Sequence, residues 1–319
     1  MDIRPSILDA IGDTPLVRLS RLHPQGNLVA KIEYVNPGGS IKDRIGLTMI
    51  EAAEREGKLQ PGGTIVEPTS GNTGVGLAMV AAIKGYRLVC VIPDKMSQEK
   101  IDGLRAYGAE VHVAPTDVEP QDPRSYYSVA DRLVAEIPGA FSPNQYANAA
   151  NPESHYQSTG PEIWDQTDGG VDVLVVGVGT GGTLTGTARF LKEKKPSIEV
   201  VGVDPVGSIY TAESEDQVHT YLTEGVGEDF WPNTFDPSLV DRFEQVPDSE
   251  AYSMARKLAA IEGILVGSSG GMAVAGALQA AADSPGKLMV VILPDSGRNY
   301  VSKVFNDEWM IEHGLLEAP

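Results

Sequence analysis

The chain contains few cysteines, few basic residues and no long hydrophobic run, and each shortage excludes a class of protein. A single cysteine, Cys90, excludes an internal disulfide and a metal site built from several cysteines. Only 25 residues are Lys or Arg against 44 Asp or Glu, and the net charge of −19 argues against binding nucleic acid or an anionic membrane over the whole surface. Apolar runs such as residues 288–293 are far too short to span a bilayer.

Two further shortages concern metals and secretion. The histidines lack the spacing of metal ligands, so we expect no metal site; they stand at positions 23, 112, 155, 219 and 313. The first residues, Met1–Pro5, contain neither the basic region nor the apolar stretch of a secretory signal. We therefore expect a soluble cytoplasmic protein that has neither nucleic acid nor membrane as a partner.

Short apolar segments alternate with helix-like segments along all 319 residues. We predict strands over residues 28–32, 64–66, 87–92, 110–114, 172–176, 199–203 and 287–293. We predict helices over residues 45–56, 75–84, 98–107, 183–194, 250–262 and 272–282. This alternation is typical of βαβ units, so we predict an α/β fold with mostly parallel, twisted sheets in two three-layer αβα domains. The smaller domain is predicted over residues 46–150, and the larger one over residues 1–45 and 151–319.

A glycine-rich segment at residues 177–183 follows the predicted strand 172–176 and precedes a predicted helix. It contains four glycines and two threonines. A glycine-rich turn at a helix N-terminus offers N–H groups, and the helix dipole favours an anion there. The simpler interpretation is a tight turn that needs glycine for its geometry alone. The position between strand and helix favours phosphate binding.

The residues alone leave the phosphate ligand open. Gly177, Gly179 and Gly182 satisfy the G-x-G-x-x-G spacing of dinucleotide-binding loops, and Asp204 follows where such a fold places its ribose-binding acid. A nicotinamide-dependent oxidoreductase, or a non-catalytic nucleotide-binding module, is therefore an alternative. Against it, the loop lies in the middle of the chain instead of opening a first βαβ unit.

A second segment, residues 36–44, joins a turn of proline and glycines to the start of a predicted helix, where Ser40 is able to cap the first turn. Lys42 then lies near the N-terminus of that helix, where the dipole disfavours an ammonium ion. A lysine that loses its proton readily suits Schiff-base chemistry. Taken alone, the segment favours an ordinary solvated surface lysine over a reactive one.

Two more polar segments follow predicted strands. Residues 67–74 supply three hydroxyls, an amide and two glycines before a helix, which suits a carboxylate held by N–H and O–H donors. The alternative is a capped helix start that needs only one of these groups. Residues 293–300 lie at the carboxyl end of the last predicted strand, where ligands of α/β sheets gather. Asp295 and Ser296 point in opposite directions if that strand continues, and composition does not choose between them.

These four segments, in this order, resemble the cysteine synthase and cystathionine β-synthase family of pyridoxal-phosphate (PLP) enzymes. The resemblance extends from residues 7–16 to Trp309 and so covers nearly the whole chain. It implies a tryptophan-synthase-β-like fold (fold type II), a PLP cleft between the two domains and a homodimer.

The resemblance assigns roles to individual residues. It implies that Lys42 forms the Schiff base with PLP, that Asn72 lies beside the ring hydroxyl and that Ser296 faces the pyridine nitrogen. The phosphate loop corresponds to Gly179, Thr180, Gly181, Gly182 and Thr183. The binders of the substrate carboxylate correspond to Thr69, Ser70, Asn72, Thr73 and Gln145.

Within the family, several segments resemble the cystathionine β-synthase branch, namely residues 126–132, residues 224–232 and residues 298–300 with 306–310. That branch condenses L-serine with L-homocysteine to L-cystathionine and water, a β-replacement by a carbon–oxygen lyase in transsulfuration and cysteine biosynthesis. The alternative is a cysteine synthase, which uses O-acetylserine or O-phosphoserine and sulfide and shares every cofactor residue.

One loop of this branch differs here from the family pattern. We predict that Gly225, Gly227 and Glu228 contact substrate, but Glu228 stands where animal and fungal members carry tyrosine. The alternative is that Glu228 is one more solvated acid. The sequence stops at Pro319 without the paired regulatory module that often follows in this branch, which fits either a severed linker or a naturally short enzyme.

Overall fold

The computed structural model describes residues 3–24, 26–69, 71–94, 96, 98–115, 117–118 and 122–317. Their contacts divide the chain into two compact units. The first unit consists of Met1–Ile11 with Asn36–Ala150, and the second of Gly12–Val35 with Asn151–Pro319. Each unit contains its own sheet, so the expected α/β class with mostly parallel sheets is confirmed. Among the described residues, no helix combines the length and apolar character needed to cross a bilayer.

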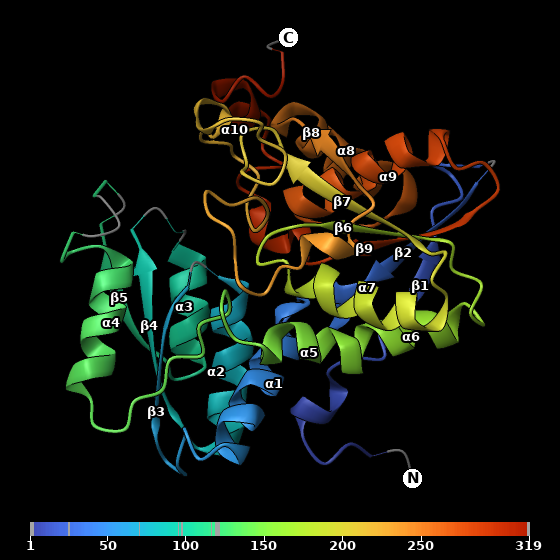
Figure 1. Cartoon of the computed structure of the whole chain (residues 1–319). Helices are drawn as coiled ribbons and strands as arrows, with labels where there is room; N and C mark the ends of the chain where they lie inside the picture. The colour runs from blue at the N-terminus through green and yellow to red at the C-terminus, as the bar shows by residue number, and fades with distance from the viewer. Residues whose placement is uncertain are drawn as a thin grey trace. The chain divides into compact units, whose positions relative to one another are not determined.

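The first unit is built on a parallel sheet of three strands in the order β3-β4-β5 (Figure 1). The strands are β3 (Thr64–Pro68), β4 (Arg87–Pro93) and β5 (Glu110–Ala114). The helices are α1 (Lys42–Arg55), α2 (Asn72–Lys84), α3 (Gln98–Ala106) and α4 (Tyr126–Glu136), with a 3-10 turn at Ile7–Ala10. Ile65 and Cys90 pack with Leu77 of α2 on one face, whereas Val66 and Val89 pack with α4 on the other. Helices therefore cover both faces.

The second unit is built on a six-stranded sheet in the order β1-β2-β9-β6-β7-β8, with α8 and α9 on one face and α6 and α7 on the other (Figure 1). Its strands are β1 (Leu16–Arg18), β2 (Asn27–Ile32), β6 (Val173–Gly177), β7 (Glu199–Pro205), β8 (Arg242–Val246) and β9 (Leu288–Leu293). Only the β1–β2 pair is antiparallel among the described strands. The carboxyl ends of five neighbouring strands therefore lie along one edge of the sheet.

The helices of this region are α5 (Ala150–Gln157), α6 (Thr159–Gln166), α7 (Gly182–Lys194), α8 (Asp248–Glu262), α9 (Ser268–Ala282) and α10 (Asp307–Glu312). Short 3-10 turns lie at Glu33–Val35, Glu215–Gln217, Pro237–Leu239 and Gly297–Tyr300. The apolar strands β6 and β9 are buried along nearly their whole length. This burial explains why they contain few polar residues.

The predicted strands and helices all occur, and the structure adds elements that the apolar pattern did not indicate. The additional strands are β1 and β8, which lie at the two edges of the six-stranded sheet and carry polar residues. The division into units differs from the expected one at residues 1–11 and 36–45, which belong to the first unit. The reason is that α1, which starts at Lys42, packs against α2.

Two glycines allow this close approach of α1 and α2. A Cβ atom on Gly46 would lie 2.8 Å from the backbone carbon of Gly76, and one on Gly76 would lie 2.7 Å from the backbone oxygen of Lys42. Real Cβ atoms essentially never come so close to backbone atoms. The contact therefore fixes the start of α1, and with it Lys42, against the first turns of α2.

We predict that Gly76→Ala lowers the free energy of unfolding by about 1–3 kcal/mol, because the added methyl forces the two backbones apart. The matched control is Gly103→Ala, at a helical glycine whose Cβ would meet nothing within 4 Å. That control should be neutral or stabilising by up to about 1 kcal/mol, since alanine favours a helix. Equal stabilities of the two variants in urea denaturation would contradict the close helix contact.

Candidate active site

Lys42 is the first residue of α1 and its side chain is partly buried. The preceding turn is closed by a bond from Gly39 N–H to the carbonyl of Asn36 at 2.8 Å, with Gly39 in the left-handed region at φ +85°. The N-cap position of α1 is Ile41, and the hydroxyl oxygen of the preceding Ser40 accepts the Lys42 N–H at 3.2 Å. Lys42 therefore stands at the positive end of the α1 dipole, which destabilises an ammonium ion relative to the neutral amine.

The start of α2 brings together the predicted carboxylate binders of the first unit. The Thr69 hydroxyl oxygen accepts from Gly71 N–H at 3.4 Å and Gly74 N–H at 3.2 Å, so this oxygen serves the helix start itself. The Thr73 hydroxyl donates to Gln145 Oε1 at 2.7 Å, and both side chains are buried. Asn72 is the first helical residue and is partly buried. Ser70, the remaining predicted binder, lies outside the described residues.

In the second unit, the glycine-rich loop joins β6 to α7, and two distant hydroxyls hold its carbonyl groups. The Tyr210 hydroxyl donates to the Gly179 carbonyl at 2.5 Å, and the Thr234 hydroxyl donates to the Thr180 carbonyl at 2.6 Å. In a trans peptide, each carbonyl points opposite to the following N–H. The N–H groups of Thr180 and Gly181 therefore point away from these two anchors. Together with the α7 N-terminus they make a candidate cradle for an anion. Within it, the Gly182 N–H already donates to the Thr180 hydroxyl oxygen at 3.4 Å.

The side chains of this loop are also held in place. Asn151 donates to the Thr180 hydroxyl oxygen at 3.1 Å. The Thr183 hydroxyl lies 3.2 Å from Nε2 of His155, whose Nδ1 lies 2.9 Å from the Thr159 hydroxyl. His155 is buried, so this chain of contacts fixes the orientation of Thr183. The pattern of the loop itself contained no signal for these supporting residues, which lie far from it in the sequence.

The segment Gly225–Glu228 packs against the phosphate loop. Gly227 N–H donates to the Val178 carbonyl at 2.7 Å, and a Cβ on Gly179 would lie 2.6 Å from the Gly225 carbonyl oxygen. The backbone of Glu228 is fixed by its N–H bond to the Ser208 hydroxyl at 3.1 Å. Burial, followed by the charge of Glu228, raises the pKa of Tyr210. Tyr210 therefore stays protonated and continues to donate to the loop.

Ser296 and Asp295 follow β9, which pairs in parallel with β6. The phosphate loop and Ser296 therefore follow the carboxyl ends of neighbouring strands. Ser296 is partly exposed and its hydroxyl oxygen accepts from Arg298 N–H at 3.3 Å. Asp295 is buried and accepts from the Tyr300 hydroxyl at 2.7 Å. Of the two side chains, the neutral Ser296 is thus the one that solvent reaches more.

Asp204, the candidate ribose-binding acid of the alternative interpretation, is the last residue but one of β7 and is fully buried. Its carboxylate accepts from the Thr211 hydroxyl at 2.7 Å. Burial raises the pKa of Asp204 to about 6. A carboxyl group committed to a hydroxyl of the same chain does not favour ribose binding.

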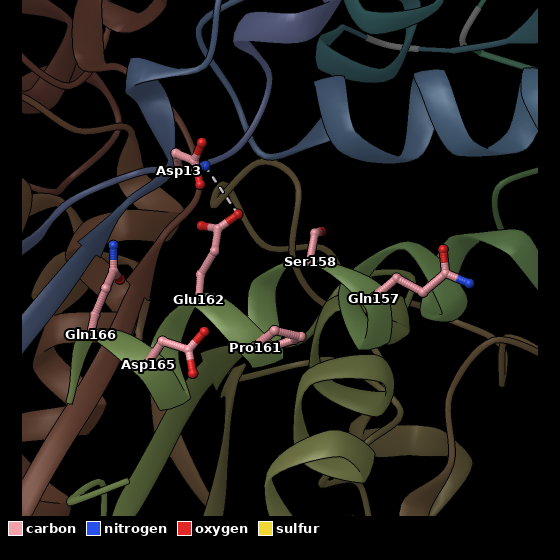
Figure 2. A pocket seen from close by; sticks show the side chains of 7 residues that line it. All are labelled: Asp13, Gln157, Ser158, Pro161, Glu162, Asp165 and Gln166. Atoms are coloured by element: carbon pink, nitrogen blue, oxygen red, sulfur yellow. Dashed lines mark hydrogen bonds between the residues drawn. The ribbon is translucent and has the colours of Figure 1, made fainter. Parts of the chain in front are cut away.

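A second lysine, Lys31, is fully buried and is bonded to other groups of the protein. Its ammonium donates to the Thr14 carbonyl at 2.6 Å, to Glu162 at 2.7 Å and to Gln166 at 2.8 Å. Glu162 also accepts from Asp13 N–H at the edge of a cavity of about 380 Å³ (Figure 2). None of the predicted site residues lines this cavity, whose walls are Asp13, Gln157, Ser158, Pro161, Glu162, Asp165 and Gln166. Three acceptors hold Lys31 as a charged donor, which argues against amine chemistry at Lys31.

The donor chemistry at these places fits PLP. A cradle of backbone N–H groups and threonine hydroxyls at the start of the 13-residue helix α7 suits a phosphate dianion. A partly exposed serine hydroxyl suits an uncharged contact to a pyridine nitrogen, and Lys42 has a primary amine of the kind that carries such a cofactor. Residues 7–295 match the family model described as pyridoxal-phosphate dependent enzyme.

Comparison with known proteins agrees with this fit. The chain is 52% identical to cystathionine β-synthase of Oryctolagus cuniculus over 99% of its length, and 42% identical to that of Saccharomyces cerevisiae over 99%. It spans 59% and 66% of the length of these two relatives. The fold is similar to a hydrogen sulfide-producing enzyme of Fusobacterium nucleatum, with a TM-score of 0.88, 39% identity and coverage of 94% of this chain and 99% of that one. It is also similar to an O-ureido-L-serine synthase, with a TM-score of 0.90, 38% identity and 96% coverage of both chains.

The family match spans nearly the whole chain, and the glycine-rich loop, Lys42 and Ser296 all lie within it or directly follow it. The two relatives named above are 52% and 42% identical to the chain over 99% of its length. The chain therefore belongs to the pyridoxal-phosphate dependent enzyme family.

Proposed function

We propose that this chain is a PLP-dependent lyase that condenses L-serine with L-homocysteine to L-cystathionine and water. The observation that carries the proposal is the 42–52% identity to relatives named cystathionine β-synthase in mammals, an insect, an amoeba and a yeast, over 99% of this chain. Because the chain spans only about three-fifths of the mammalian relatives, the reaction and its substrates are inferred for this chain rather than carried over.

The proposed cofactor contacts rest on the family resemblance, and the geometry of the loop Gly179–Thr183 supports them. Lys42 carries the cofactor, Asn72 lies beside its ring hydroxyl and Ser296 faces its pyridine nitrogen. The phosphate is held by the loop Gly179–Thr183, whose cradle is kept in place by Tyr210. When bound, PLP supplies an electron sink that stabilises negative charge at the substrate Cα.

The residues of the chain then have separate tasks. The N–H groups at the start of α2, together with Thr73 and Gln145, bind the substrate carboxylate, which the α2 dipole attracts. Thr69 acts at the same helix start, and Ser70 is assigned here by the resemblance alone. The neutral amine of Lys42 removes the proton from Cα and returns it after the incoming thiol has added to Cβ. The serine hydroxyl is a poor leaving group and departs with a proton. We propose that the Glu228 carboxylate orients the water that supplies this proton.

The resemblance further supports a homodimer in the cytoplasm, and we propose both. Cysteine synthase activity, from O-acetylserine or O-phosphoserine and sulfide, is the second candidate function. Neither of the two similar structures, at 39% and 38% identity, is named a cystathionine β-synthase, so the fold alone does not choose between the two substrate pairs. A nicotinamide-dependent oxidoreductase is the third and weakest candidate. The glycine-rich loop lies within the match to a family of pyridoxal-phosphate dependent enzymes, which favours PLP over a dinucleotide as its ligand.

We predict that Lys42→Ala loses the visible absorbance of bound PLP and nearly all turnover while it remains folded, because the amine both carries the cofactor and moves the proton. The control is Lys58→Ala, which removes a lysine from an exposed surface pair with Glu56. Absorbance spectra, far-ultraviolet circular dichroism and turnover check the prediction. Wild-type turnover and spectrum in Lys42→Ala would exclude Lys42 as the PLP lysine.

We predict that Tyr210→Phe weakens PLP binding about five- to tenfold, because the lost hydrogen bond contributes about 1 kcal/mol and frees the Gly179 carbonyl. The control is Tyr156→Phe, which removes a hydroxyl bonded to Glu193 on the surface. Fluorescence titration of the apoenzyme with PLP measures both affinities. Equal affinities of the two variants would mean that the anchor does not shape the phosphate cradle.

We predict that Glu228→Gln slows the reaction of serine with homocysteine more than that of O-acetylserine with sulfide, because acetate leaves without a proton whereas hydroxide does not. The control is Asp229→Asn, the exposed neighbouring acid. Steady-state assays with both substrate pairs test the wild type and the two variants. Equal slowing in both assays removes Glu228 from leaving-group departure, and a wild type active only with O-acetylserine and sulfide favours cysteine synthase.

A further inference from the structure

A buried carboxylate, Glu67, lies under the turn that presents Gln145. Glu67 is the fourth residue of β3 and is 1% exposed. Beside β3, Phe141 N–H donates to the Thr64 carbonyl and the Phe141 carbonyl accepts from Val66 N–H, each at 2.9 Å. The chain after Phe141 therefore runs parallel to β3 and reaches the level of Glu67 at residues 144 and 145.

Both oxygens of Glu67 hold the backbone of this turn. Oε2 accepts from Asn144 N–H at 3.0 Å, and Oε1 accepts from Gln145 N–H at 3.4 Å. The side chain of Ser142 also bonds to the Glu67 carboxylate. One carboxylate thus satisfies two consecutive N–H groups, an arrangement that aligns both peptide planes of the turn.

The backbone of the turn is strained at Asn144, which has φ +48°. An ordinary non-glycine residue in the left-handed region costs about 1–2 kcal/mol, and asparagine, which tolerates this region better, costs less. The Asn144 carbonyl accepts from Ala147 and Asn148 N–H at 3.1 and 3.0 Å. The N–H of Asn144 is bound by Glu67, so the carboxylate is one of the groups that holds this conformation.

The strained turn determines where the Gln145 side chain points. The backbone of Gln145 is held by Glu67 at one end, and its Oε1 accepts from the Thr73 hydroxyl at 2.7 Å at the other. Thr73 is the second residue of α2, at the helix start where we placed the substrate carboxylate. A rotation of the turn would carry Gln145 away from Thr73 and from that helix start.

Burial of the Glu67 carboxylate costs free energy, because a charged group is less stable away from water. This cost argues against a purely structural role for Glu67. In the register of β3 with β4, Glu67 lies opposite Cys90, which belongs to the apolar face covered by α2. Burial raises the pKa of Glu67 to about 7, although the N–H bonds of Asn144 and Gln145 act in the opposite direction. A glycine at position 144 would adopt the same turn without steric strain from a Cβ atom.

We propose that Glu67 is a positioning residue of the amino-acid site, which holds the strained turn at Asn144 and thereby aims Gln145 at the substrate carboxylate. The inference rests on the proposed function, because it assigns the carboxylate of an amino-acid substrate to Gln145 and the start of α2. It adds a residue that does not itself touch substrate or cofactor.

The test is Glu67→Gln, which keeps the size of the side chain but turns one acceptor into an amide that meets an N–H of the turn. We expect the KM for L-serine and the dissociation constant of L-serine, measured by calorimetry on the PLP-loaded enzyme, to rise about tenfold or more. We expect kcat to change less than about threefold. The substitution weakens the binding of substrate and transition state equally and leaves proton transfer intact. The affinity for PLP should not change.

Two further variants separate positioning from general stability. Glu262→Gln is the matched control, since Glu262 also accepts two consecutive backbone N–H groups, those of Arg21 and Leu22 at 2.9 and 2.6 Å, in the second unit. It should leave L-serine binding unchanged. Asn144→Gly added to Glu67→Gln should recover part of the lost affinity, because glycine adopts the left-handed conformation without strain.

The outcomes are distinct. Weaker L-serine binding in Glu67→Gln, with recovery by Asn144→Gly, supports the positioning role. If Glu67→Gln binds L-serine as tightly as the wild type, the positioning role is wrong. It is also wrong if the variant loses kcat, PLP affinity and thermal stability while its affinity for L-serine is unchanged. If the wild type and Glu262→Gln bind no L-serine, the proposed function itself fails and the positioning role with it.

Discussion

Helix N-termini that follow parallel strands are the constraint on which the rest of the structure depends. In a parallel sheet the carboxyl ends of the strands lie at one edge, so the helices that follow them start at that edge with unpaired N–H groups and positive dipole ends. In the first unit α2 starts there after β3, and in the second unit α7 starts there after β6. An anionic phosphate and an anionic carboxylate are what such helix starts bind.

Groups behind each helix start keep its binding surface in place. The phosphate loop has its carbonyls turned aside by Tyr210 and Thr234, and its threonine hydroxyls contacted by Asn151 and His155. At the start of α2, the Thr73–Gln145 bond is supported from below by the buried Glu67. Each site thus depends on buried polar side chains that have no chemical step of their own. Such supports explain how neutral hydroxyls and amides acquire fixed directions.

The sequence predicted the elements with apolar strands and the loops with glycine, because those features are local. Edge strand β8 escaped prediction since its residues Arg242–Val246 alternate without a clear apolar run. The helices α5 and α6 were not predicted because each is only 8 residues long, too short to show a helical pattern of apolar residues. The supports Tyr210, Thr234, His155 and Glu67 were not predicted to act on the loops, because they reach them through tertiary contacts. Asp295 and Ser296 were undecided from composition, and only the burial of Asp295 with Tyr300 distinguishes their surroundings.

The account depends most on the identity of the lysine that carries the cofactor. Two lysines have special environments, Lys42 at the start of α1 and Lys31 between three acceptors. Borohydride reduction of the PLP-loaded protein, followed by proteolysis and mass spectrometry of the peptides, identifies the residue that carries the cofactor. The account predicts a phosphopyridoxyl group on Lys42. A phosphopyridoxyl group on Lys31 or on another lysine, or no modified peptide at all, would contradict it.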